Sequence, residues 1–358
     1  AQVNSIDFLY LPSEIHRMDG NFMHSKVKDK DGFGLTAGYG YTPSKNFYSG
    51  IGIKYYDDRF DLNDMGYLIL NDRFMFNGRT QFKRTTFREG SVLRSRLFEI
   101  GYGSKFNVDS ERESSNFALK LENNFVNLSE IKAEVFYRST GRNTRITRGS
   151  KFAPFIKMPK GMGGYIDFTG PRRPTYVYGL RFERGRGSEH SPELGWGTKS
   201  RGYLKYMPTD TLSFSLMYQH QRENEWLNWY GDNLLATFQR KQRTSIVEME
   251  WFRNNIHELR IKAQMVAFTG REPQSFLGDL SGNLNPEDIY IPPITISELA
   301  FQVRYRYEIM PLSYLYLVYS KGGRVSLQDE EDDLFSLYRR PWNSPEKENF
   351  TVKLRYRF

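Results

Sequence analysis

The sequence predicts an all-β fold, a transmembrane antiparallel β-barrel, on three observations. Aromatic residues make up 16% of the 358 residues although the hydrophobic share is 39%, which is typical of strands that alternate lipid-facing apolar and polar residues. Apolar and polar side chains alternate with period 2 along many segments. Short turns alternate with long polar connections. We find no run near the roughly 20 apolar residues that a membrane-spanning helix needs.

Alternation along the strands is the first of these observations. Val303, Tyr305 and Tyr307 alternate with Arg304 and Arg306, so a strand there has one apolar and one cationic face. A soluble β-sandwich also alternates, but it rarely places Arg and Lys so regularly opposite an aromatic face. The same pattern recurs at 211–218, 259–265 and 350–358.

The alternation of short and long connections predicts how the barrel is oriented in the membrane. Short turns rich in Pro, Asn and Ser lie at 11–14, 42–45, 127–130, 170–173, 207–210, 254–257 and 310–313. Long polar connections are expected at 107–115, 184–199, 269–297 and 321–349. Outer-membrane barrels have short periplasmic turns and longer outside loops, so we expect a bacterial outer-membrane location with the C-terminus in the periplasm.

The strand count suggests a longer precursor. We expect about 16–18 strands, with seventeen as the central count, whereas bacterial single-chain barrels have even numbers. The first strand would also descend from the outside. We therefore expect residues 1–358 to be a single outer-membrane barrel, the C-terminal part of a longer precursor that supplies upstream strands.

Several motifs resemble a known family. They are Arg304-Tyr305-Arg306-Tyr307, 311–313, Leu315, 318–320 and 353–358, with a second match over 60–72 and looser ones over 149–159 and 169–174. The chain resembles bacterial outer-membrane proteins whose barrel follows a periplasmic domain similar to family-nine carbohydrate-binding modules. Leu62 and Leu70-Asn71 stand where that family usually has a proline and an arginine. The resemblance implies architecture, location and an upstream periplasmic domain, and it brings no catalytic residues.

Charged strand residues are expected to face the lumen, because Arg or Lys facing lipid at mid-depth costs about 2–4 kcal/mol. The basic set is Arg181, Arg260, Lys262, Arg304, Arg306, Lys353, Arg355 and Arg357. The acidic set is Glu122, Glu134, Glu183, Glu248 and Glu250. Because Glu248 and Glu250 lie across one hairpin from Arg260 and Lys262, we expect cross-strand ion pairs. The charges form either a structural ladder or a cationic lining that favours anionic solutes.

The last strand is expected to carry the signal that the barrel-assembly machinery recognises. Its apolar set is Phe350, Val352, Leu354, Tyr356 and Phe358. An apolar end to the last strand by chance is the competing interpretation.

Three features of the outside loops have two interpretations each. Asp329, Glu330, Asp332 and Asp333 could hold a divalent cation brought near by lipopolysaccharide, or form a solvated acidic loop. The segment 269–297 could constrict the barrel or cover it. The aromatic residues Trp226, Trp229 and Tyr230 could stack on sugars or belong to an aromatic girdle.

Function is the least specified property. The five histidines lie in no catalytic context and no nucleotide or zinc motif is present, so we expect neither an enzyme nor a cofactor. The net charge of +9 is spread over strand positions, which argues against nucleic acid. We expect a pore or gated channel for small polar or anionic solutes. The alternative is a non-conducting scaffold that anchors a periplasmic domain or partner complex and displays loops, and in both cases lipid and lipopolysaccharide surround the protein.

Overall fold

The computed structural model describes residues 2–62, 71–148, 150–186, 194–254, 256–328 and 333–357. Over these residues the structure is all-β, with 73% strand and one short helix, and the strands form a large antiparallel sheet of 17–18 strands. The predicted fold class and the predicted count of strands are therefore confirmed. The chain divides into two compact units.

The first unit is an antiparallel meander in which each strand from β1 to β7 pairs with the next. Its strands are β1 (Gln2–Ser13), β2 (His16–Val27), β3 (Lys30–Ser44), β4 (Phe47–Tyr56), β5 (Arg73–Arg84), β6 (Leu93–Phe106), β7 (Arg112–Phe125) and most of β8 (Glu130–Arg138). A separate two-stranded sheet joins β9 (Gly141–Asn143) and β10 (Ile156–Met158).

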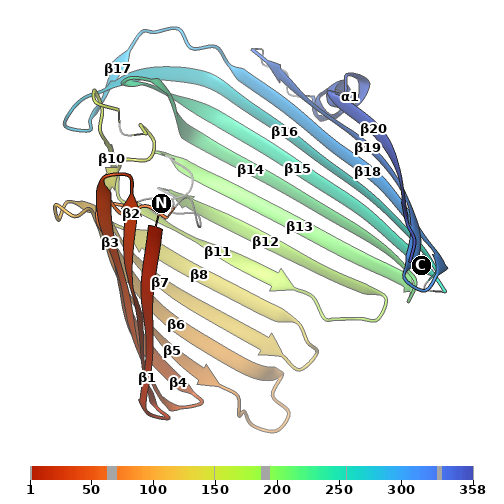
Figure 1. Cartoon of the computed structure of the whole chain (residues 1–358), viewed down its shortest axis with the longest axis horizontal. Coiled ribbons are helices and arrows are strands. Elements are labelled where there is room, and N and C mark those ends of the chain that lie inside the picture. The colour runs from red at the N-terminus through yellow and green to blue at the C-terminus, as the bar shows by residue number, and fades with distance from the viewer. Residues whose placement is uncertain are drawn as a thin grey trace. The chain divides into compact units, whose positions relative to one another are not determined.

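The second unit is a meander of longer strands, which are labelled in Figure 1. It holds most of β11 (Gly161–Thr169), then β12 (Tyr176–Arg186), β13 (Trp196–Thr209), β14 (Leu212–Gly231), β15 (Leu234–Arg253), β16 (His257–Gly278), β17 (Leu284–Glu287), β18 (Ile294–Met310), β19 (Ser313–Leu327), α1 (Leu334–Asn343) and β20 (Lys347–Arg355). Strand β16 pairs with β15 and β18 along most of its length, and the short β17 pairs with its end.

The seven predicted short turns each fall where two consecutive strands join, but residues 11–13, 42–44 and 207–209 still belong to β1, β3 and β13. In the turn between β18 and β19, Met310 is the partner of Ser313, and Leu312 has a φ of 68°. A left-handed residue of this kind is unusual outside Gly, Asn and Asp, because Cβ crowds the following carbonyl. Here the tight connection between paired strands imposes it.

The long connections are shorter than predicted. Strand β12 continues to Arg186, β13 begins at Trp196, and β16 continues to Gly278. The prediction was wrong because it read polar residues as loop, whereas ladder hydrogen bonds hold the backbone in strands whatever the side chains are. The connection after β19 also contains helix α1, which was not predicted.

The segment between β16 and β18 packs on β15. Ile291 is buried against Ala236 and Phe238, and Trp226 and Ile294 pack around them. At the tip of this connection, which belongs to the first unit, Gly282 O accepts a hydrogen bond from Lys157 N at 2.8 Å. Within the second unit, the segment is thus held by a small apolar core.

Candidate functional site

In the second unit, rows of side chains across the strands alternate between charged and apolar. Residues directly opposite one another in antiparallel strands project from the same face. One row, from β15 to β20, holds Glu250, Arg260, Arg304, Val318 and Thr351. The adjacent row on the other face holds Met249, Ile261, Val303, Tyr319 and Phe350. The sheet of this unit therefore has a charged face and an apolar face.

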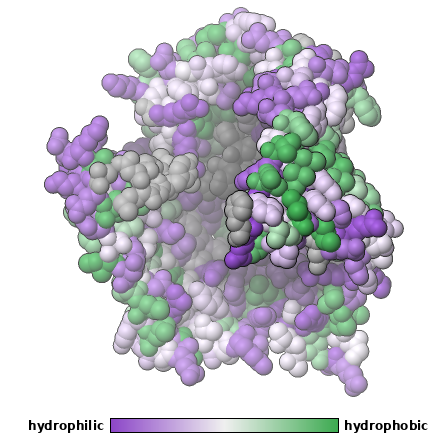
Figure 2. All heavy atoms as spheres, turned by 45° about the vertical axis from the view of Figure 1, so that its right-hand side comes forward, coloured by the Kyte–Doolittle hydropathy of each residue, from purple (hydrophilic) through white to green (hydrophobic). Residues whose placement is uncertain are grey.

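Large side chains of the apolar face are exposed. Leu180 is 62% exposed, Phe350 66% and Leu354 61%. Side chains of this kind are buried in the core of a soluble protein. Figure 2 shows hydrophobic residues gathered in patches between strongly hydrophilic ones on the visible surface. Contiguous exposed apolar surface indicates contact with a membrane or a partner.

Glu258 is the centre of the charged face. Its side chain is 6% exposed and contacts three arginines. The distance to Arg260 Nε is 2.5 Å, to Arg304 Nη2 3.1 Å and to Arg306 Nη2 3.0 Å. Charged hydrogen bonds of this kind are roughly twice as strong as neutral ones. One carboxylate therefore holds three guanidinium groups on neighbouring strands.

The position of Glu258 offsets the repulsion between two arginines that the strand register places opposite each other. Arg260 and Arg304 are directly opposite each other on β16 and β18, and like charges in that position repel. Glu258 Oε1 lies between them and binds both. Glu258 is therefore the carboxylate that the two opposed arginines share.

The predicted cross-strand pairs of β15 and β16 are confirmed. Lys262 Nζ lies 2.6 Å from Glu248 Oε1, and Arg260 Nε lies 3.7 Å from Glu250 Oε1. These four residues, with Gln302 and Arg304, line a cavity of about 220 Å³. The cavity is a polar recess among paired charges.

Arg181 makes a second ionic group on β11–β13. It lies 3.5 Å from Asp167 Oδ2 and 3.2 Å from Glu183 Oε2, and its guanidinium is 3.8 Å from the ring centre of Tyr165. Arg201 Nη2 lies 4.0 Å from Asp167 Oδ2. The predicted Arg181 and Glu183 are thus brought together, and Asp167 joins them.

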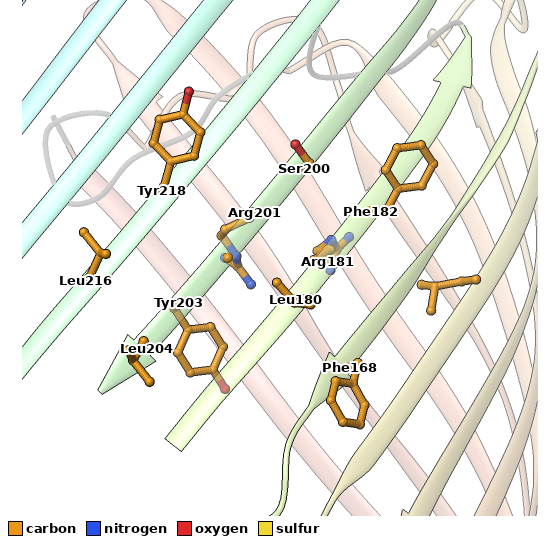
Figure 3. Close-up of a pocket in the computed structure, with 12 residues that line it drawn as sticks. Phe168, Leu180, Arg181, Phe182, Ser200, Arg201, Tyr203, Leu204, Leu216 and Tyr218 are labelled. Atoms are coloured by element: carbon orange, nitrogen blue, oxygen red, sulfur yellow. The ribbon is translucent and has the colours of Figure 1, made fainter. Parts of the chain in front are cut away.

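An open groove of about 750 Å³ lies over the same strands. Figure 3 shows apolar side chains from β11 to β14 around it, together with Arg181 and Arg201. Gly202 leaves room in the groove, since a Cβ there would lie 3.3 Å from Leu180 Cδ2. The apolar lining residues are Ile166, Phe168, Leu180, Phe182, Leu204 and Leu216.

The other predicted basic residues lie near the end of the chain. Lys353 is opposite Tyr316, which is opposite Arg306, so Lys353 shares the charged face. Arg355 is opposite Tyr314 on the same face. Arg357 follows β20, and its backbone N donates to Ser313 Oγ at 3.0 Å.

The predicted acidic residues of the first unit belong to separate strands. Glu122 on β7 lies 3.8 Å from Lys120 Nζ and accepts from Asn124 Nδ2 at 3.2 Å. Glu134 is half-buried on β8 beside Val135, which is 58% exposed. Neither belongs to the cluster around Glu258.

The apolar residues of the last strand lie on the apolar face. Phe350, Val352 and Leu354 are opposite Tyr319, Leu317 and Leu315. Tyr356 follows the strand and is exposed, and Phe358 lies outside the described residues. Their role as an assembly signal stays a prediction.

The candidate metal ligands are not gathered into a site. Asp329, Glu330 and Asp332 lie outside the described residues. Asp333 is the N-cap of α1, and its Oδ2 accepts from Ser336 N at 2.8 Å. Within the described ranges, no group of three or more His, Cys, Asp or Glu residues could hold a metal ion.

Trp226 belongs to a packed cluster. Its ring lies 5.9 Å from Phe238 and 5.4 Å from Phe268, and Arg240 stacks on it at 5.2 Å. Arg240 Nη1 also binds the buried Glu223 at 3.1 Å. Trp229 Nε1 donates to Asp232 O at 3.1 Å.

The structure describes the two ends of segment 60–72, which matches the family motif in the sequence. Phe60 is 1% exposed and stacks on Tyr56 at 5.4 Å. Asn71 Nδ2 donates to Asp58 O at 2.6 Å, and Asp72 Oδ1 accepts from Val108 N at 2.9 Å. The remainder, 63–70, lies outside the described residues.

Sequence reasoning missed Glu258 and helix α1. The signal for Glu258 was present, because it alternates with Leu259 and precedes Arg260 by two residues, which places both on one face. Helix α1 had a signal in Asp333, an acceptor three residues before the Ser336 amide that it caps. Pro341 inside the helix concealed it.

Among the described residues, no helix is long and apolar enough to cross a membrane. No curated protein matches the chain. One similar solved structure is that of the siderophore receptor PirA from Acinetobacter baumannii. It has 10% sequence identity and a TM-score of 0.41, with 98% of this chain and 70% of that chain covered. The model of a family described as a domain of unknown function, DUF5916, matches residues 9–358, and the chain belongs to that family.

Proposed function

We propose that the chain forms the wall of an outer-membrane β-barrel that passes small polar or anionic solutes. The observation that carries the proposal is the alternation of charged and apolar rows from β15 to β20. A strand with one apolar and one charged face suits a wall between lipid and water.

The apolar face supports contact with lipid. Leaving a Leu or Phe side chain in water instead of burying it forgoes about 1.5–3 kcal/mol, and this face exposes many of them. Acyl chains would fill the groove over Gly202. In this orientation the short turns and the C-terminus lie in the periplasm, where the barrel-assembly machinery would meet β20.

The charged face supports anionic solutes. Arg260, Lys262, Arg304, Arg306, Arg324, Lys353 and Arg355 lie on it, together with the carboxylates of Glu248, Glu250, Glu258, Glu298 and Glu308. A surplus of fixed positive charge along a water-filled passage concentrates anions and repels cations. Further strands and a periplasmic carbohydrate-module-like domain would complete the protein.

A second candidate is a non-conducting scaffold. Its support is that the charges bind one another, with Glu258 holding three arginines and Glu248 holding Lys262. Charges that pair with one another in this way can stabilise the barrel wall without binding a solute.

Single-channel recording of the full-length protein in a planar bilayer, under a salt gradient, tests the proposal. We expect steady openings with an anion-selective reversal potential, and Arg304→Gln with Arg306→Gln shifts it toward zero. The matched control is Arg172→Gln with Arg173→Gln, because both are exposed in the turn after β11, and it leaves selectivity unchanged. An inserted but silent barrel would overturn the channel in favour of the scaffold.

A further inference from the structure

The connection from β16 to β18 folds back onto the sheet of the second unit. Its part 284–293 begins with β17, which pairs with the long-loop end of β16 (Figure 1). Ile291 is 6% exposed and packs against Ala236 and Phe238. Tyr290, the residue before it, is 84% exposed. The segment therefore has one side chain that anchors it and a neighbouring one that stands in the open.

A hydrogen bond fixes the start of the same segment. Ser275 Oγ on β16 donates to Glu287 O at 2.6 Å. Ser275 is directly opposite Ala236 on β15, so the two side chains project from one face of the sheet. The hydrogen bond and the apolar anchor thus hold segment 284–293 against a single face.

That face is the charged face. The ladder between β16 and β18 has no register shift as far as Gly270 and its partner Ile294. Gly270 follows Arg260 at an even number of positions, so both project from the same face. A Cβ at Gly270 would lie 3.2 Å from Phe238 Cδ1, and Ile294 packs on the same cluster as Ile291. The anchor of the segment therefore lies on the face that carries Arg260.

Helix α1 packs on the other face. Its Tyr338 OH lies 3.1 Å from Ser245 Oγ, and its Trp342 packs edge-on against Phe301 at 5.4 Å. Ser245 and Phe301 occupy the apolar rows, which alternate with the charged ones. These two segments of the second unit therefore cover opposite faces of the sheet, and 284–293 covers the charged one.

The surface below the segment is firmly packed. Arg240, which is directly opposite Gly270, binds the buried Glu223 at 3.1 Å. Its guanidinium lies 5.2 Å from the ring centres of both Trp226 and Phe268. Side chains that hold one another in this way stay in one arrangement. Segment 284–293 thus rests on a rigid part of the wall.

We propose that segment 284–293 is a constriction of the passage along the charged face, and that Ile291, by anchoring it, sets the size of the solutes that pass. The inference rests on the proposed function, in which this face lines water. A chain segment held on the inner wall reduces the open cross-section, and the narrowest part of a pore determines what it admits.

Single-channel conductance and permeation of lipid vesicles by neutral sugars of increasing size test the inference on the full-length protein. Ile291→Ser removes the apolar anchor, so we expect conductance to rise at least about twofold and larger sugars to enter. The matched control is Ile289→Ser, the same substitution in the same segment at a side chain that is 40% exposed. It should leave both measurements unchanged. Conductance and size limit that stay at the wild-type values in Ile291→Ser would overturn the inference.

A reversible tether gives a second readout. The chain has no cysteine, so Ile291→Cys with Ala236→Cys can form a single disulfide. Oxidation should hold conductance at the wild-type value, and reduction should raise it. Thr237→Cys in place of Ala236→Cys is the control and should form no disulfide, because its side chain projects from the other face.

The tether also separates the two proposals, because a disulfide forms whether or not the protein conducts. A barrel that inserts, forms the disulfide with position 236 and stays silent refutes the proposed channel. A conducting barrel that forms the disulfide equally well with position 237, or conducts equally when oxidised and reduced, refutes this inference alone.

Discussion

Replacing Glu258 by glutamine removes one negative charge and keeps the size of the side chain. The carboxylate is 6% exposed and holds Arg260, Arg304 and Arg306, whose side chains are 44%, 40% and 32% exposed. Breaking a fully buried ion pair costs about 3–5 kcal/mol. Because the arginines can rehydrate in part, we expect the lower end, about 3 kcal/mol of unfolding free energy.

Urea unfolding of the protein refolded into lipid vesicles measures this loss. The matched control is Glu248→Gln, because Glu248 and Lys262 are 37% and 53% exposed, and it should cost less than about 1 kcal/mol. Adding Arg304→Gln to Glu258→Gln should recover stability, since Arg260 and Arg304 would no longer repel each other. Equal losses for the two single variants would refute the central position of Glu258.

Three further predictions concern the apolar face, a close backbone contact and the helix. Val352→Arg should cost about 2–4 kcal/mol in vesicles, whereas Thr351→Arg, on the charged face, costs much less; equal losses by urea unfolding would contradict the assignment of faces. Gly32→Ala should cost about 1–3 kcal/mol by the same measurement, because the added Cβ would collide with the backbone of Phe60. Gly101→Ala, with nothing within 4 Å, is its control, and a tolerated Gly32→Ala would refute the close contact. Burial raises the pKa of Tyr338 above its ordinary value of 10.0, so the neutral phenol favours the docked helix. Docking is therefore stable below that value and weakens as pH rises through the raised pKa. Trp342 emission, taken as the difference from a Trp342→Phe variant, follows the release. Tyr338→Phe should abolish this alkaline transition, and its persistence would contradict the assignment.

The strands and turns were predictable because alternation depends on local sequence. Val303 to Tyr307 specifies two faces without reference to any partner. Turn residues such as Pro311 mark the hairpin ends. The extent of the strands was not predictable, because the polar ends of β12 and β16 are held by pairing with distant residues.

The arginines of the candidate site were predictable from the sequence, whereas the central carboxylate, Glu258, was not. Alternation placed Arg260, Arg304 and Arg306 on one face. The register between β16 and β18 decides that Glu258 reaches all three, and register is a property of the paired strands. Helix α1 was missed for a similar reason, since its stability comes from packing on β16, β18 and β19.

Cysteine scanning along β18 tests the central claim, that the charged face meets water and the apolar face meets lipid. The chain has no cysteine, so a single cysteine introduced at any position from 302 to 307 can be labelled without background from native thiols. We predict that cysteines replacing Gln302, Arg304 and Arg306 react with a membrane-impermeant maleimide in vesicles. Fluorophores at Val303, Tyr305 and Tyr307 should be quenched by a lipid-soluble nitroxide. Uniform reactivity along the strand, or quenching at the even positions, would contradict the account.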